Sequence, residues 1–283
     1  MRKTKKYMVN LLMFCMVMIG VFLIPQKTYA KDSDFVIENG VLKEYKGHSK
    51  NVVIPNGVTT IDMNIFGDTD QDTEFIETIT IPSSVKKLNS GDRFAYCFNT
   101  FWCPNLKKII VSKDNKYFSS VNGVLYNKEK TTLIRYPRGQ HKMVSIPKTV
   151  ITVSDGAFSM CHIKNFKIPK TIKKIGKGGF AYITDDKLIN LIIPNSVKSI
   201  GEGAFYWSGI KNVVVSSKMK KIPDYAFADC SDLKTVTIPK SIKKIGYGIF
   251  QHHEKNVTIK GYKGSYAQSY AKKNNIKFKE IKK

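Results

Sequence analysis

The sequence predicts a repeat solenoid, in which short units stack with a parallel β-sheet on one face and turns or short helical segments on the other. Three observations lead to this fold class. One pattern recurs along most of the chain, its apolar residues alternate as in a half-buried strand, and the segments at the two ends differ from those between them. Internal repetition of this kind is the signature of stacked architectures.

The recurring unit joins an I-P step, a lysine-rich segment and an aromatic residue. Its consensus is L-x-x-V-x-I-P-x-x-V-K-x-I-G-x-x-A-F-x-x-C. Steps of 22, 25, 22 and 23 residues separate the equivalent positions Pro147, Pro169, Pro194, Ser216 and Pro239. This period lies within the ~20–29 residues of leucine-rich repeats. The sequence therefore predicts leucine-rich repeats over residues 52–259.

One unit illustrates the expected local structure. Val236 and Ile238 alternate with threonines, which predicts a strand with one buried face. Pro239 ends the strand because it has no N–H for the ladder. Gly246 is expected to permit a tight bend. The aromatic residue, such as Phe227, is expected to enter the interior from a short turn or helical segment.

Three segments depart from the period. Residues 112–146 contain two apolar runs around a polar tip, which predicts a β-hairpin insertion. Residues 31–51 resemble this hairpin and are expected to form an N-terminal cap. Residues 260–283 are expected to form a C-terminal cap, with a short helix begun by Ser265 and Gln268 at capping-box spacing, and then a last strand.

The N-terminal segment has the layout of a secretory signal peptide. Basic residues precede an apolar run over residues 11–24, and residues 28–30 offer a small-residue cleavage site. Fourteen apolar residues are too few to span ~30 Å of hydrocarbon. Residues 1–30 are thus predicted to be removed, leaving residues 31–283 as one secreted domain without a transmembrane segment or wall-anchoring tail.

The charge balance is strongly basic. The net charge is +25, and the five basic residues of the signal segment, which has no acid, leave +20 on residues 31–283. Such an excess favours anionic partners. Solubility of a secreted protein is the alternative explanation and needs no partner.

The outward residues of the predicted strands are the first candidate binding surface. In the last strand of the series they are expected to be Asn256 and Thr258. Strands stack ~4.8 Å apart, so a long sheet suits a protein or polymer ligand. Alternatively, the asparagines and threonines only hydrate the sheet. The candidate residues are Asn165, Asn190, Ile192, Asn212, Val214, Thr235 and Thr237.

A set of lysines in one repeat position, the lysine stripe, is the second candidate. Stacking would bring these charges about 5 Å apart, within a Debye length of ~8 Å. A linear polyanion would relieve their repulsion and release counterions. Alternatively, the stripe is a solvated edge. Its members are Lys86, Lys87, Lys173, Lys174, Lys198, Lys220, Lys221, Lys243 and Lys244.

The cysteines and histidines indicate no catalytic or metal site. Cys103, Cys161 and Cys230 are expected in the core, whereas a local disulfide between Cys97 and Cys103 remains open. The five histidines are scattered, and no motif joins a nucleophile to a base or binds a metal, cofactor or nucleic acid. Of Tyr206 and Trp207, one is expected to pack and the other to be exposed.

The chain resembles the BspA-like leucine-rich repeat proteins of bacteria over residues 35–281. The resemblance is carried by I-P-x-x-V-K-K-I-G-x-x-A-F, by the G-V-L-Y hairpin and by the terminal G-S-Y-A-Q-S-Y-A-K-K-N-N-I-K-F. It implies a secreted or cell-surface protein, often one that adheres to host or bacterial partners.

The resulting hypothesis is a monomeric, non-catalytic, macromolecule-binding protein of adhesion type. Its expected partner is a protein or an anionic polysaccharide at the cell envelope or a host surface. Three alternatives remain open: attachment to the anionic polymers of the cell's own wall through the lysine stripe, an enzyme with a site between repeats, and a purely structural or assembly component.

Overall fold

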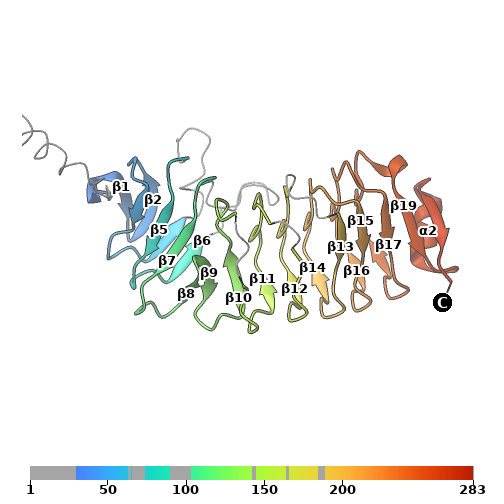
Figure 1. Cartoon of the computed structure of the whole chain (residues 1–283), viewed down its shortest axis with the longest axis horizontal. Helices are drawn as coiled ribbons and strands as arrows, with labels where there is room; N and C mark the ends of the chain where they lie inside the picture. Colours follow the sequence, from blue (N-terminus) through green and yellow to red (C-terminus); the bar gives the residue numbers. More distant parts are fainter. Residues whose placement is uncertain are drawn as a thin grey trace, which may run out of the picture.

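The computed structural model describes residues 30–62, 65, 74–89, 103–141, 145–163, 166–183 and 189–282. They form an elongated stack in which each repeat unit contributes one rung (Figure 1). The N-terminal strands lie at one end and the helix α2 (Tyr266–Lys273) at the other. The predicted signal peptide lies outside the described residues, except for Ala30.

One face of the stack, the strand face, is built from the strands of the predicted leucine-rich repeats. In each, a central apolar residue is buried and its neighbours point outward, as the alternation predicts. All pairings within this face are parallel. Its strands are β3 (Asn51–Val53), β5 (Thr78–Ile81) and β7 (Lys108–Val111), and then β13 (Asn190–Ile192), β15 (Asn212–Val214), β17 (Thr235–Thr237), β19 (Thr258–Gly261) and β20 (Lys277–Glu280).

A second face, the short-strand face, lies across the core from the first. Turns occupy much of this side, as expected, and the structure adds short parallel strands in which polar residues point out and an isoleucine, valine or, in β6, leucine points in. These strands are β4 (Thr60–Asp62), β6 (Lys87–Asn89), β11 (Thr152–Val153), β12 (Lys174–Ile175), β14 (Ser199–Ile200), β16 (Lys221–Ile222) and β18 (Lys244–Ile245).

Glycine follows three of the short strands, β12, β14 and β18, and is needed there for close packing. A Cβ on Gly201 would overlap the backbone nitrogen of Lys177 in the preceding rung, and a Cβ on Gly246 would overlap the backbone of Asp224. Neither glycine has a positive φ. The chain turns at residues 247–250, directly after Gly246, and close approach between rungs explains why glycine is needed at this position.

A column of stacked phenylalanines fills the interior, as the repeat predicts. Successive ring centroids lie 4.8, 5.6, 5.7 and 6.4 Å apart, with interplanar angles of 7° to 25°. Every ring is at most 1% exposed. Tyr136 extends the column, with its ring 5.2 Å from the first phenylalanine. The column consists of Phe158, Phe180, Phe205, Phe227 and Phe250.

The predicted hairpin insertion is confirmed and is larger than expected. β9 (Val124–Asn127) pairs antiparallel with β10 (Thr132–Arg135), and β8 (Phe118–Val121) adds a third antiparallel strand. β10 then pairs parallel with β11, so the insertion continues the short-strand face. The core residues before and after this meander form two clusters that meet at its strand β9.

The N-terminal end of the described chain also carries a hairpin. A 3₁₀ turn, η1 (Asp32–Asp34), leads into β1 (Phe35–Glu38), which pairs antiparallel with β2 (Val41–Tyr45). β2 in turn pairs parallel with β4 of the short-strand face.

The helical C-terminal cap is confirmed. The Ser265 hydroxyl accepts from the Gln268 N–H at 3.4 Å and begins α2, and β20 pairs parallel with β19. The register before the cap differs from the expectation, because the 3₁₀ turn η3 (Glu254–Asn256) precedes β19. Thr258 pairs with Thr235, so the outward residues of β19 are Thr258 and Lys260, and the assignment of Asn256 was wrong.

Membrane-spanning structure was searched for in the described ranges only. None of the helices found there combines the length and the apolar character needed to cross a bilayer.

Candidate binding surfaces

The C-terminal members of the lysine stripe occupy equivalent positions in successive rungs, as predicted. Lys221 of β16 pairs in register with Lys244 of β18. The Lys243 N–H donates to the Lys220 carbonyl at 2.8 Å. In the preceding rungs the Lys198 N–H donates to the Lys173 carbonyl, also at 2.8 Å. Ser199 takes the place of a lysine in the rung between Lys174 and Lys221, and it pairs with Lys174.

These lysines are exposed and lack an acidic counterpart among the described residues. The ion pairs found within 4.0 Å in those ranges involve other lysines, such as the pair between Lys107 and Glu77 at 2.9 Å. Positive charges in successive rungs, without ion pairs to carboxylates among the described residues, produce a strong local potential. The arrangement suits a ligand with repeated negative charges.

The two N-terminal lysines of the stripe share a groove with one of its later members. Lys86, Lys87 and Lys174 line one groove of about 480 Å³, between β6 and the strands β11 and β12. Phe118 and Ile134 of the insertion also line it. The insertion thus separates the two parts of the stripe in sequence, while the groove joins them in space.

Another set of lysines, separate from the stripe, was missed by the sequence analysis. These side chains are exposed in the turns that connect the strand face to the short-strand face. The Pro-Lys dipeptides that follow three of the strands were the available signal. The Lys240 Nζ lies 4.9 Å from the Tyr262 ring centroid. We call this set the turn lysines: Lys148, Lys170, Lys218 and Lys240.

The polar candidates of the strand face point outward and bond to one another. The Asn212 Nδ2 donates to the Asn190 Oδ1 at 2.9 Å, and the Thr235 Oγ1 donates to the Asn212 Oδ1 at 2.7 Å. This ladder supports the interpretation that these side chains satisfy the sheet itself. Thr237 is half-buried, and Asn165 lies outside the described residues.

The apolar candidates of the same face remain open to solvent. Ile192 is 64% exposed and Val214 is 43% exposed. They are paired in register on β13 and β15, so their side chains form one small apolar patch.

Aromatic side chains also lie near the surface, two residues after the column phenylalanines Phe180 and Phe205. Trp207 is 50% exposed, whereas Tyr206 is half-buried, as expected for the pair. The Trp207 ring lies 6.1 Å from that of Tyr182, the equivalent residue of the preceding rung. Both residues have left-handed backbone, with φ of 49° and 58°.

In the last two rungs, the repeat position of Trp207 is occupied by Asp229 and His252, which form an acid–histidine pair at the surface. The Asp229 Oδ1 lies 2.6 Å from the His252 Nδ1. This hydrogen bond, followed by the charge of Asp229, raises the pKa of His252 above its ordinary value of 6.5.

Replacing Asp229 with asparagine is expected to lower the pKa of His252. Since the folded-state pKa is raised, the contact stabilises the fold below the unfolded-state pKa and this contribution is lost as pH rises through the folded-state pKa. NMR titration of the imidazole in both proteins measures the change. An identical midpoint in the two proteins would contradict the assigned pair.

The described cysteines are core residues, as predicted. The Cys161 thiol donates to the Tyr136 carbonyl at 3.3 Å and the Cys230 thiol to the Phe205 carbonyl at 3.2 Å. Burial raises the pKa of Cys161 to about 11 and that of Cys230 to about 12, so both stay protonated. Cys103 is also buried, and Cys97 lies outside the described residues.

Acidic, histidine and cysteine side chains were also compared for metal-binding geometry. Within the described ranges, no group of three or more of them could hold a metal ion.

Comparison with known proteins agrees with the repeat architecture. A family model described as a BspA type leucine rich repeat region matches residues 36–141 and 135–257, with six copies. No curated protein sequence matches the chain.

Several solved structures are similar to this one. A leucine-rich repeat protein from Eubacterium ventriosum is 25% identical, over 70% of this chain and 66% of that chain, with a TM-score of 0.51. The pneumococcal vaccine antigen PcpA is 18% identical, over 84% and 69%, with a TM-score of 0.57. A leucine rich cell surface protein from Faecalibacterium prausnitzii is 21% identical, over 82% and 60%, with a TM-score of 0.51.

The extent of these matches limits what they show. This chain spans 60% to 69% of the solved chains that it matches. At 18% and 21% identity, the second and third structures show a shared fold alone.

Proposed function

Because the chain belongs to the BspA-type leucine-rich repeat family, we propose that it is a surface-associated binding protein that holds a linear anionic polymer along the lysine stripe. The polymer carries repeated phosphate, sulfate or carboxylate groups. The observation that carries this proposal is the row of exposed lysines in register without acidic partners among the described residues.

The spacing of the rungs supports a polymer over a small anion. Parallel rungs lie ~4.8 Å apart, so the stripe presents a charge at close intervals along the long axis of the molecule. Each neutralised anionic group releases condensed counterions, which gives binding a strong dependence on salt. The turn lysines lie beside the stripe and widen the basic surface.

Two features support a location outside the cell. The N-terminal segment has the layout of an export signal. One similar solved chain is described as a leucine rich cell surface protein. In this proposal the polymer belongs to the envelope of the producing cell or to a host surface, and the chain acts by adhesion and not by catalysis.

Reversing four stripe charges is expected to abolish binding to a polyanion. The variant carries Lys173→Glu, Lys174→Glu, Lys243→Glu and Lys244→Glu. Titration calorimetry with heparin and with purified teichoic acid measures the affinity, with neutral dextran as the blank. For about six contacts, the affinity of the unmodified chain should fall by roughly 10²–10³ between 50 and 200 mM salt.

A matched variant separates the stripe from net charge. It carries the same four-charge change at exposed lysines outside the stripe, Lys234, Lys255, Lys277 and Lys279. The proposal expects this control to retain most of the affinity. Equal losses in the two variants would mean that only the overall charge matters, and turnover of the polymer would contradict a non-catalytic role.

A protein contact on the strand face is the second candidate. It is favoured by the paired, exposed Ile192 and Val214, which offer an apolar patch within a polar sheet. Ile192→Asp should then weaken adhesion to a protein-coated surface while leaving heparin binding unchanged.

A further inference from the structure

The first four rungs that carry a phenylalanine of the column each donate three hydrogen bonds to the next rung. The donors alternate along the chain, at positions i, i+2 and i+4. In one rung the N–H groups of Gly203, Phe205 and Trp207 donate to the carbonyls of the following rung at 3.1, 3.1 and 2.9 Å. Three other rungs repeat this register, with the donor sets Gly156, Phe158 and Met160; Gly178, Phe180 and Tyr182; and Tyr225, Phe227 and Asp229.

The last rung leaves the same three donors open. Gly248, Phe250 and His252 occupy the donor positions, and their N–H groups have no acceptor within the described part of the chain. The C-terminal cap continues the strand face through β20, but its described residues supply no carbonyls to these three donors. The ladder therefore ends in a row of unused donors.

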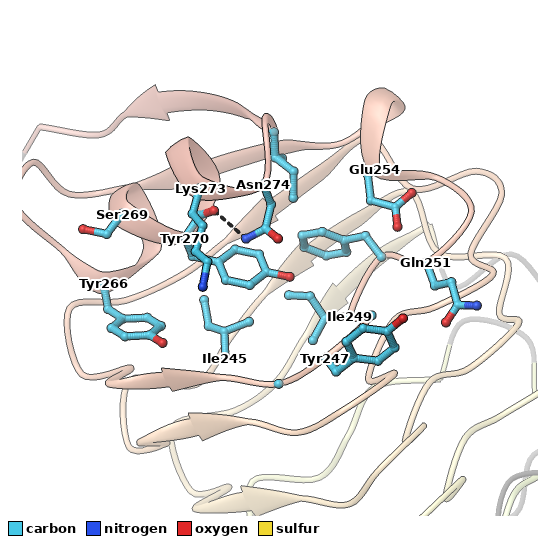
Figure 2. Close-up of a pocket in the computed structure, with 14 residues that line it drawn as sticks. Ile245, Tyr247, Ile249, Gln251, Glu254, Tyr266, Ser269, Tyr270, Lys273 and Asn274 are labelled. Carbon is cyan, nitrogen blue, oxygen red and sulfur yellow. Dashed lines mark hydrogen bonds between the residues drawn. The ribbon is translucent and has the colours of Figure 1, made fainter.

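Two of the three donor residues, Gly248 and Phe250, line a cleft of about 560 Å³, the terminal cleft, between the last rung and α2 (Figure 2). Gly248 and Phe250 line one side, together with the buried Ile245 and Ile249. Phe250 ends the aromatic column, with its stacked neighbour Phe227 on the side away from the cap.

The helix supplies the other wall with mixed polar and aromatic groups. Tyr266, Ser269, Tyr270 and Lys273 line the cleft from α2, and Asn274 bonds to the Tyr270 carbonyl at 2.8 Å. Burial, followed by the charge of Glu254, raises the pKa of Tyr270 to about 12, so its hydroxyl remains neutral. The cleft thus joins an apolar floor to a rim that can hydrogen-bond.

We propose that the terminal cleft binds an extended peptide segment of a partner protein, which takes the place of one further rung. Alternate carbonyls of the peptide accept from Gly248, Phe250 and His252, and an apolar side chain packs against the exposed ring of Tyr247 at the cleft wall. A polypeptide backbone matches this register, because the chain itself meets it four times. Adding an extended segment to an open edge is a recurrent mode of peptide recognition.

A peptide copied from the chain provides the probe. Residues 221–229, K-I-P-D-Y-A-F-A-D, carry the carbonyls that accept from the preceding rung. A fluorescein-labelled peptide of this sequence should bind the mature chain saturably in a fluorescence-anisotropy titration. Replacing its phenylalanine with serine should weaken binding at least about tenfold, since the apolar contact with the Tyr247 ring is lost.

Two protein variants place the peptide in the cleft. Ser269→Trp fills the cleft from α2 and should weaken binding at least about tenfold. Lys272→Trp, on the same helix but outside the cleft lining, should bind as the unmodified chain does. Tyr247→Ala removes an exposed wall residue without filling the cleft and should also weaken binding. Thermal unfolding followed by circular dichroism checks that each variant folds.

Hydrogen exchange supplies a readout at the donors themselves. Bound peptide should slow amide exchange in residues 246–253 and leave the N-terminal rungs unchanged. Absence of saturable binding, or equal binding by folded Ser269→Trp, would overturn the proposal. Displacement of the peptide by heparin would also overturn it, because binding would then depend on the lysines.

Discussion

Replacing Phe205 with alanine is expected to lower the free energy of unfolding by about 3–5 kcal/mol, the usual cost of truncating a buried aromatic residue. Phe205 is 0% exposed, and its ring centroid lies 5.6 Å from that of Phe180 and 5.7 Å from that of Phe227. Removing the ring leaves a cavity in the middle of the column. The surrounding rungs are held by backbone hydrogen bonds and cannot collapse fully into it.

Urea unfolding followed by circular dichroism measures this effect. Trp207→Ala is the matched control, because it removes a larger aromatic side chain from the same rung at a half-exposed position. Its expected cost is about 1 kcal/mol or less. Equal midpoint shifts for the two variants would contradict a packed column, provided that the denaturant slopes are the same.

Replacing Gly201 with alanine is expected to cost about 3 kcal/mol, although only one methyl group is added. The new Cβ would overlap backbone atoms of Lys177 and Gly176, which cannot rotate away as a side chain could. Relieving the overlap requires the rungs to separate. The hydrogen bond from the Gly201 N–H to the Ile175 carbonyl, now 2.9 Å long, would then weaken.

Ser199→Ala provides the control for this substitution. Ser199 is exposed two residues before Gly201, so its replacement should change the unfolding midpoint little. Heparin binding offers a second readout, because separated rungs would also move Lys198 away from Lys173. A Gly201→Ala protein with unchanged stability would contradict the close approach of the rungs.

Most of the architecture could be predicted from the sequence because the repeat encodes burial locally. Alternation around Val236 assigns its face without reference to any other rung, and the recurrence of Phe227 and its equivalents indicates an aromatic column. The stripe could be found in the same way, since a constant repeat position becomes a row when units stack. The register of β19 could not, because η3 breaks the spacing on which the alignment of Asn256 rested.

The candidate surfaces were predicted less completely. The sequence placed Asn190, Asn212 and Thr235 on one face, but only the structure showed that they bond to one another. It named the lysines of the stripe and missed the turn lysines despite their Pro-Lys dipeptides, whereas the groove at Lys86 depends on how separate segments meet. Whether a charge has a partner is a property of distance in space and not of position in the chain.

The sequence by itself therefore determined the solenoid, the inward and outward assignment of its side chains and the common position of the stripe lysines. These properties follow from the pattern within one repeat. The tertiary structure alone decided the short-strand face, the need for glycine at Gly201 and the open donors of Gly248, Phe250 and His252. Each of these depends on backbone atoms of neighbouring rungs, which residue identity does not specify until the chain has folded.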